Sequence, residues 1–216
     1  PLLHGAMWTI ALSAVAAFGA VAVGLIVCAG RLSASPVFAR PAKIYIEIIR
    51  GTPLLLQLFF LYYGLPDLGI VLPAFLAGVL GLSLNFGAYL AELFRAGIQS
   101  VDPGQRQAAR SLGMTGLMLF YLVVMPQALR NIFPALGNYA LVLVKDSSLV
   151  AVISVLELMR TGELLASATF RALEVYALVG VFYFAICFVL ARGFIITERR
   201  LVIPGSIAAE AASGRK

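Results

Sequence analysis

The chain has 216 residues, of which 62% are hydrophobic and only 12% are charged. This balance excludes a soluble globular domain of this length and indicates a polytopic membrane protein. The formal net charge of +6 is the excess that Lys and Arg produce in cytoplasmic loops, so we expect no nucleic-acid partner.

Five apolar segments are long enough, or nearly long enough, to cross a bilayer, which takes about 20 helical residues. We therefore expect an all-α integral membrane protein with five transmembrane helices in one domain over residues 1–204. The second span is expected to break near Pro53, because the proline ring disfavours helix at the residue before it. The expected spans are residues 8–30, 51–65, 71–94, 134–158 and 173–196.

Basic residues cluster in alternate loops. They gather between the first two spans, between the third and fourth, and after the fifth, whereas the loop around Asp67 has no basic residue. By the positive-inside rule, this pattern predicts an N-terminus outside the cell and a cytoplasmic C-terminus. The small, polar tail over 205–216 is expected to be a disordered cytoplasmic segment.

A polar island lies between the third and fourth spans, on the side predicted to be cytoplasmic. Asp102 suits a helix N-cap, Pro103 the first helical position and Gly113 the residue after the last turn, so we expect a helix over about 103–112. Its small apolar face is surrounded by polar side chains, which suits a groove on a partner protein. The alternative is an ordinary helix on the membrane surface, although such helices usually carry bulkier apolar side chains. The candidate contact residues are Gln105, Arg106, Gln107, Ala108, Ala109, Arg110, Leu112 and Gly113.

Several motifs resemble one family in their order and spacing. The Ala108-Ala109 pair, with Gly113 and then Val123 and Met125-Pro126, resembles the docking loop of ABC importer permeases. A narrower set is similar to the polar amino acid uptake subfamily, the histidine/arginine/glutamine-type permeases, over about residues 45–200. That set is Tyr45, Arg50–Leu55, Gln57, Tyr89, Glu92, Arg95–Ile98, Gly104-Gln105, Pro126–Arg130, Asn138 and Lys145–Leu149.

The resemblance implies a type I ABC importer permease fold, like that of the methionine importer, in a bacterial inner membrane. It also implies cytoplasmic ABC ATPase subunits, a second permease subunit and an external solute-binding protein, with a polar amino acid as substrate. This chain has no Gly-x-x-x-x-Gly-Lys-Ser/Thr motif, so we expect no cofactor or metal in it and assign ATP and Mg to the partner ATPase. We therefore expect a transport subunit rather than an enzyme.

Two positions depart from the family pattern. Gln107 stands where the family usually has Glu, and Met125 stands where it has Leu. Loss of the carboxylate removes one possible ion pair with the ATPase. Because exposed pairs contribute only about 0–1 kcal/mol, we expect docking to rest more on Arg106, Arg110 and the shape of the helix.

The fourth span contains ionisable residues, which are costly in a membrane and indicate function. Lys145, Asp146, Ser147 and Ser148 fall roughly 18 Å from Pro134, near the midplane, where transporters commonly bind substrate. Asp146 could meet an ammonium or guanidinium group, and the serines or Lys145 could meet a carboxylate. The alternative is a buried Lys–Asp pair that only fixes helix packing.

Polar residues on the second and third spans are weaker candidates for lining the path. Asn85, Tyr89 and Glu92 share one helix face, and Gln57 is isolated in an apolar run. Glu92 can instead pair with Arg95, three residues away.

Two other functions remain as alternatives. One is a passive channel, which would not need an ATPase-docking helix, or a permease for another small solute. An intramembrane enzyme would need a catalytic constellation, which His4 and the isolated Asp146 do not supply.

Overall fold

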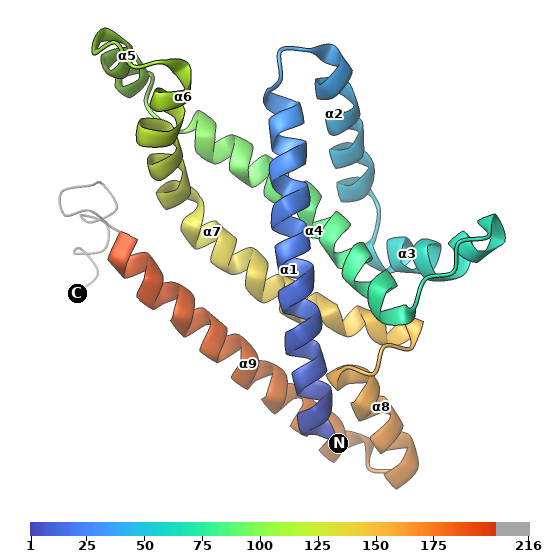
Figure 1. The fold of residues 1–216 in the computed structure, drawn as a ribbon. Coiled ribbons are helices and arrows are strands. Elements are labelled where there is room, and N and C mark those ends of the chain that lie inside the picture. Colours follow the sequence, from blue (N-terminus) through green and yellow to red (C-terminus); the bar gives the residue numbers. More distant parts are fainter. Residues whose placement is uncertain (202–216) are drawn as a thin grey trace.

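The computed structural model describes residues 1–201, which form a helical bundle (Figure 1). Residues 202–216, including the tail predicted to be disordered, lie outside the described part. The α-helices are α1 (Leu2–Leu32), α2 (Pro36–Gly51), α3 (Leu54–Phe59), α4 (Ala74–Gln99), α5 (Pro103–Ser111), α6 (Gly116–Leu119), α7 (Met125–Asp146), α8 (Leu158–Thr169) and α9 (Ala172–Leu201). Short π or 3-10 segments are η1 (Phe60–Gly64), η2 (Leu65–Leu68), η3 (Phe120–Val124) and η4 (Ser147–Ile153).

The described helices supply the five expected spans, provided that one bent pair counts as a span. Four of them are long and apolar enough, and Pro36–Gly51 with Leu54–Leu68 makes the fifth, bent by 107°. The bend begins at Thr52 and Pro53, where the sequence predicts a break. The helix before the bend, α2, starts well before residue 51, where the span was predicted to begin. Because α2 is amphipathic and contains charged residues, it does not form a continuous apolar run in the sequence.

The fourth span is also longer than expected. It runs over Gly116–Ile153 and keeps Pro134 inside α7, instead of starting there. Proline is tolerated in a membrane helix when local π or 3-10 adjustments satisfy the freed backbone groups, and η3 lies just before α7.

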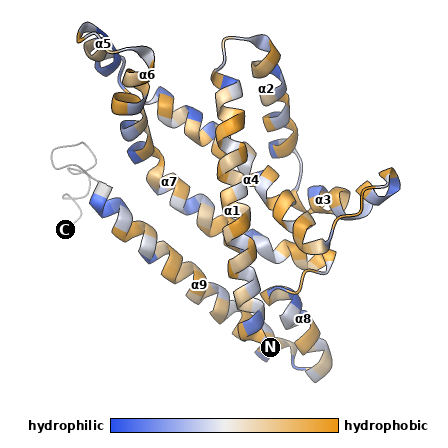
Figure 2. Cartoon of the chain, in the orientation of Figure 1, coloured by the Kyte–Doolittle hydropathy of each residue, from blue (hydrophilic) through white to orange (hydrophobic). Residues whose placement is uncertain are grey.

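The two ends of the bundle differ in composition. The α1–α2 connection and α5 lie at one end, at the top of Figure 1, and the N-terminus and α8 lie at the other. Figure 2 shows the hydrophobic colour along α1 and α9 and the hydrophilic colour on α5. The segments that the positive-inside rule assigns to the cytoplasm, around Arg31 and Arg106, therefore share one end.

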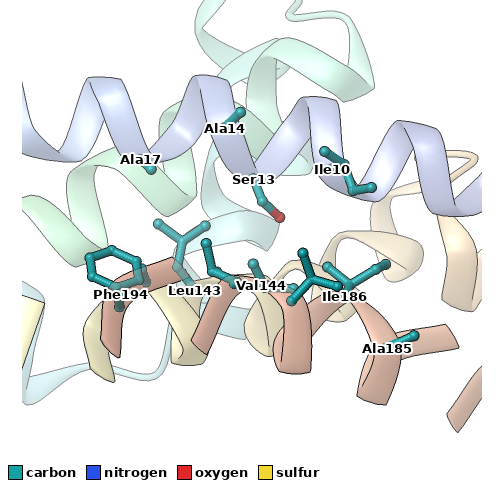
Figure 3. Close-up of a pocket in the computed structure, with 12 residues that line it drawn as sticks. Ile10, Ser13, Ala14, Ala17, Leu143, Val144, Ala185, Ile186 and Phe194 are labelled. Carbon is teal, nitrogen blue, oxygen red and sulfur yellow. The ribbon is translucent and has the colours of Figure 1, made fainter. Parts of the chain in front are cut away.

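A cavity of about 580 Å³ separates the middle of α9 from α1 and α7 (Figure 3). Its lining is apolar except for Ser13, whose hydroxyl points into the space and has no hydrogen-bond partner in the described chain. An apolar lining of this kind can contact hydrocarbon, but it has no group that could bind the charges of a zwitterion. We therefore do not place the transport path there.

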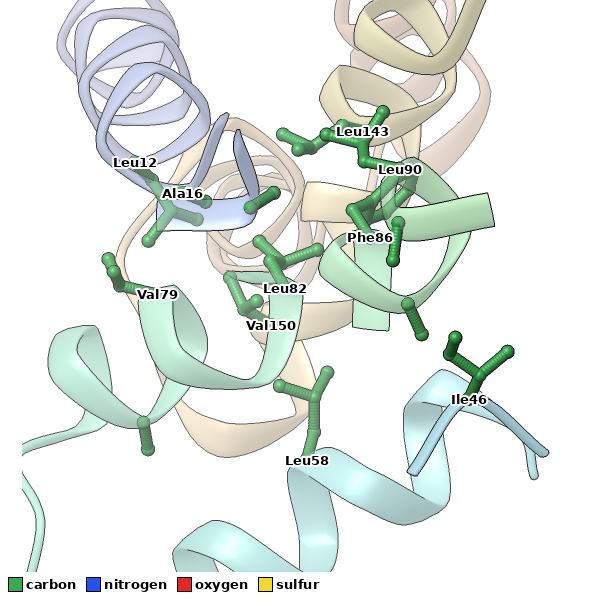
Figure 4. Packing of buried hydrophobic residues seen from close by; sticks show 14 of the residues in the cluster. Leu12, Ala16, Ile46, Leu58, Val79, Leu82, Phe86, Leu90, Leu143 and Val150 are labelled. Carbon is green, nitrogen blue, oxygen red and sulfur yellow. The ribbon is translucent and has the colours of Figure 1, made fainter. Parts of the chain in front are cut away.

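The core is centred on α1 against α4 (Figure 4). Small residues bring the two backbones together: a Cβ atom on Gly87 would lie 2.5 Å from Cγ1 of Val23. Close approach through small residues is the usual way that membrane helices gain dispersion contacts, because lipid offers no hydrophobic drive between them. This pair forms the rigid centre on which α2, α3 and α7 pack.

At the α8 end, a buried carboxylate ties three helices together. Glu157 is completely buried and caps α8, accepting from the amides of Met159 and Arg160 at 2.9 and 2.8 Å. It also accepts from the hydroxyls of Thr9 on α1 (3.2 Å) and Tyr183 on α9 (2.8 Å). Burial raises the pKa of Glu157 above 4.5, and these hydrogen bonds oppose the shift. No local signal in the sequence marks this residue, because the usual N-cap residues are Ser, Thr, Asp and Asn.

Candidate functional site

The polar island forms a short helix, α5, as predicted. Asp102 is its N-cap and accepts from the amide of Gly104 at 2.5 Å. Gly113 follows the last turn with a φ of +76°, a left-handed conformation that glycine adopts without strain. The helix ends at Ser111, one residue before the predicted end, and Leu112 is its C-cap.

One face of α5 is fixed to the bundle and the other is free. Ala109 is 4% exposed and packs in a small core with Val101, Leu119 and Ala128. Leu112 is 78% exposed, so the apolar face predicted for this helix is divided between the bundle and the surface. Of the candidate contact residues, those left exposed are Gln105, Gln107, Ala108, Arg110, Leu112 and Gly113.

Arg106 belongs to the fixed side. Its guanidinium donates to the carbonyl of Ile98 in the last turn of α4, and the side chain is only partly exposed. A carbonyl at a helix C-terminus has no partner within its own helix, so a cation there satisfies it and interacts favourably with the helix dipole. A second link joins Asn131 of α7 to Ser100, with Nδ2 2.9 Å from Oγ. The helix α5 is thus attached to the last turn of α4, and the turn that precedes α5 is attached to the first half of α7.

The charged residues predicted near the midplane lie at the end of α7. Lys145 is exposed and Asp146 partly exposed, and neither forms an ion pair with any described residue. Within residues 1–201, Lys145 and Asp146 therefore do not form the buried ion pair that was the alternative. From Asp146 to the end of η4 is seven residues, or about 14 Å of 3-10 helix, which is close to half the hydrocarbon thickness.

The neighbouring serines use their hydroxyl protons internally. Ser147 is fully buried and donates to the carbonyl of Val144 at 2.7 Å. Ser148 donates to the carbonyl of Lys145, also at 2.7 Å. Of the four residues predicted here, Lys145 and Asp146 therefore present the available polar groups.

Gln57 on α3 spans the break after α2 and also binds Asn85 on α4. The side-chain amide of Gln57 donates to the carbonyl of Ile49 and to Oγ1 of Thr52, both at 2.9 Å. Asn85 is 6% exposed and donates to Oε1 of Gln57 at 3.1 Å. These contacts satisfy backbone groups that the bend leaves open, which favours a structural role over the predicted lining role.

Tyr89 is partly exposed and belongs to an aromatic pair that the sequence did not reveal. Its ring centroid is 6.0 Å from that of Tyr139 on α7. The guanidinium carbon of Arg50 lies 5.1 Å from the centroid of Tyr89. Glu92, one turn further along α4, pairs with Arg95 at 2.5 Å, as the structural alternative predicted. It also lies 3.6 Å from Arg31 on α1, a contact that was not predicted.

Comparisons with known proteins agree on one family. The family described as binding-protein-dependent transport system inner membrane component matches residues 20–202. A probable amino-acid ABC transporter permease of Sinorhizobium fredii is 40% identical over 182 residues, covering 84% of this chain and 79% of the relative. The glutamine transport system permease of Escherichia coli is 37% identical over 206 residues, covering 94% and 93%.

Solved structures agree with the fold. A chain of an amino acid ABC transporter crystallised with histidines has a TM-score of 0.87 and 43% identity, covering 92% of this chain and 93% of that one. A chain of an inward-facing methionine ABC transporter has a TM-score of 0.79 at 19% identity, covering 94% and 96%, which bears on the fold alone. The chain has the type I ABC importer permease fold and belongs to the family of binding-protein-dependent transport system inner membrane components.

Proposed function

We propose that this chain is the membrane-spanning subunit of an ATP-driven importer that carries a polar amino acid across a bacterial inner membrane. Separate ABC ATPase subunits would supply the energy, an external solute-binding protein would deliver the substrate, and a second permease subunit would complete the path. Relatives named as amino-acid and glutamine permeases support the substrate class. In the orientation that the positive-inside rule predicts, the N-terminus lies outside, and the C-terminus and α5 lie in the cytoplasm.

The observation that carries the proposal is the construction of α5. The helix is capped at both ends, fixed by Ala109 and Arg106, and leaves a polar and small-residue face exposed at one end of the bundle. A helix presented in this way suits a groove on a cytoplasmic partner. The exposed face of α5 contains Gln107 where the family usually has Glu, so Arg110 supplies the formal charge of this face.

The substrate path is proposed to pass the exposed end of α7. Asp146 is a carboxylate without an ion-pair partner among the described residues and lies near the depth at which transporters bind substrate. It would bind the ammonium or guanidinium group of the amino acid through a charge-assisted hydrogen bond. Replacing Asp146 with Asn should abolish or redirect uptake and leave assembly with the ATPase unchanged. Unchanged uptake kinetics would contradict this assignment.

The importer is tested with the purified complex. The permease should be co-expressed with the ATPase and binding protein encoded beside it and reconstituted into proteoliposomes. We expect uptake of one radiolabelled L-amino acid from a panel to require ATP, and the loaded binding protein to stimulate ATP hydrolysis. A passive channel would instead give flux that is insensitive to ATP. Absence of both substrate-stimulated hydrolysis and ATP-dependent uptake would overturn the proposal.

A further inference from the structure

The last turn of α2 presents a cation in the middle of the broken span. Arg50 is the penultimate residue of α2, directly before the 107° bend, and its side chain is exposed. In a bilayer such a residue is costly unless it faces a cavity or a partner. Arg50 therefore needs a counter-charge or an aqueous surface.

No acidic residue in the described chain provides that counter-charge. Arg50 forms none of the salt bridges of residues 1–201. The nearest acidic residue along α2 is Glu47, whose carboxylate lies 3.6 Å from the ammonium of Lys43. Among residues 1–201, the contact that meets the charge of Arg50 is the face of the Tyr89 ring.

The contact with Tyr89 holds the guanidinium in place without using its hydrogen bonds. A cation above a ring interacts with the π-system, and the side-chain N–H groups of Arg50 make no hydrogen bond to a described residue. The planar N–H edge of guanidinium matches a carboxylate in a bidentate arrangement. A cation that is held but not paired is suited to binding an anionic group of a ligand.

The Tyr89–Tyr139 pair lies between Arg50 and the helix that contains Asp146. Tyr89 packs against Tyr139, and Asp146 follows Tyr139 by seven residues. Two residues seven apart lie on the same helix face, about 10 Å from each other along the axis. A cation on α2 and an anion on α7 thus flank one aromatic surface, which complements the charges of an amino acid.

We propose that Arg50 binds the α-carboxylate of the transported amino acid. The inference rests on the proposed function and adds a residue to it. Arg50 holds the negative end of the substrate at the bend of the second span, and Tyr89 positions the guanidinium through its ring.

The test is equilibrium binding of a radiolabelled amino acid to the permease–ATPase complex in nanodiscs, without the solute-binding protein. The ligand is the amino acid that the wild-type complex takes up in proteoliposomes. We expect Arg50→Met, which keeps an apolar stem over Tyr89, to weaken binding at least tenfold, and Arg50→Lys to weaken it less. Lys43→Met removes a cation from the same helix and should leave binding unchanged. The unlabelled α-carboxamide of the same amino acid should not displace the label from the wild-type complex.

The outcomes separate the inference from the proposed function. If the wild type takes up no amino acid, the proposed function fails. If uptake proceeds, any one of three results overturns the role of Arg50: no binding by the wild-type complex, binding by Arg50→Met within twofold of wild type, or equal displacement by the carboxamide. If Arg50→Met does not assemble, equal displacement by the carboxamide still overturns the proposal, and Arg50→Lys tests the residue itself.

Discussion

Replacing Glu157 with Ala should destabilise the permease more than any change to an exposed carboxylate. The carboxylate accepts two amides of α8 and the hydroxyls of Thr9 and Tyr183, so its removal leaves four donors without their acceptor. Loss of an N-cap costs about 0.5–2 kcal/mol, and each buried polar group left unsatisfied costs about 1–3 kcal/mol. Because the hydroxyls can rotate towards other acceptors, we expect a total of about 3–5 kcal/mol.

Thermal unfolding in detergent micelles measures this loss. Trp8 is the single tryptophan of the chain and is adjacent to Thr9, so its fluorescence reports on the end of the bundle where Glu157 lies. At about 2–4 °C per kcal/mol for a chain of this size, the melting temperature should fall by about 6–20 °C.

The matched control is Glu163→Ala on the same helix. Glu163 pairs with Arg160 at 2.9 Å but is about one-third exposed, so its removal should cost at most about 1 kcal/mol. If Glu157→Ala melted within 1 °C of the wild type, the carboxylate would not be tying α1, α8 and α9 together, and the reasoning would be refuted.

Three further predictions follow from particular contacts. Because burial raises the pKa of Glu157, the carboxyl group stays protonated to a higher pH in the folded state than in the unfolded state. The melting temperature should therefore fall as the pH rises from 4.5 through the raised pKa of the folded state. Glu157→Gln should remove this dependence on pH. Arg106→Gln should lower substrate-stimulated ATP hydrolysis more than ATPase association, measured by turnover and co-purification, whereas Arg110→Gln should weaken mainly association; the reverse pattern would contradict the assigned roles. Gly97→Ala should lower the free energy of unfolding by about 1–3 kcal/mol, because the new Cβ would lie 2.3 Å from Cγ2 of Ile132. Adding Ile132→Ala should recover part of this stability in thermal melts. An unshifted melting temperature for Gly97→Ala would refute the clash.

The sequence predicts well those features that depend on local chemistry. The cap at Asp102, the left-handed turn at Gly113 and the break at Pro53 each follow from the conformational preference of one residue and its neighbours. The apolar runs likewise predict the number of spans, because a bilayer imposes a minimum length on any crossing helix.

Features that depend on packing between distant helices are not predictable in the same way. Gln57 and Asn85 are 28 residues apart, and nothing in either segment shows that one amide will bind the other. The direction in which Arg106 points is similarly decided by the end of α4, so a residue expected to contact a partner protein is bound within its own chain. Glu is not one of the usual N-cap residues, and the full burial of Glu157 follows from the meeting of three helices.

The arrangement of α4 and α7 connects α5, the proposed docking helix, with the proposed path. The helix α5 is bound to α4 at Ile98, and the turn before it is bound to α7 at Asn131. Tyr89 lies about 14 Å along α4 from the first attachment, and Tyr139 lies about 12 Å along α7 from the second. Because a helix transmits displacement along its axis more readily than a loop, a pull on α5 would reach the two tyrosines together. In the proposed importer, ATPase movement would therefore change the spacing of the surface that holds Arg50.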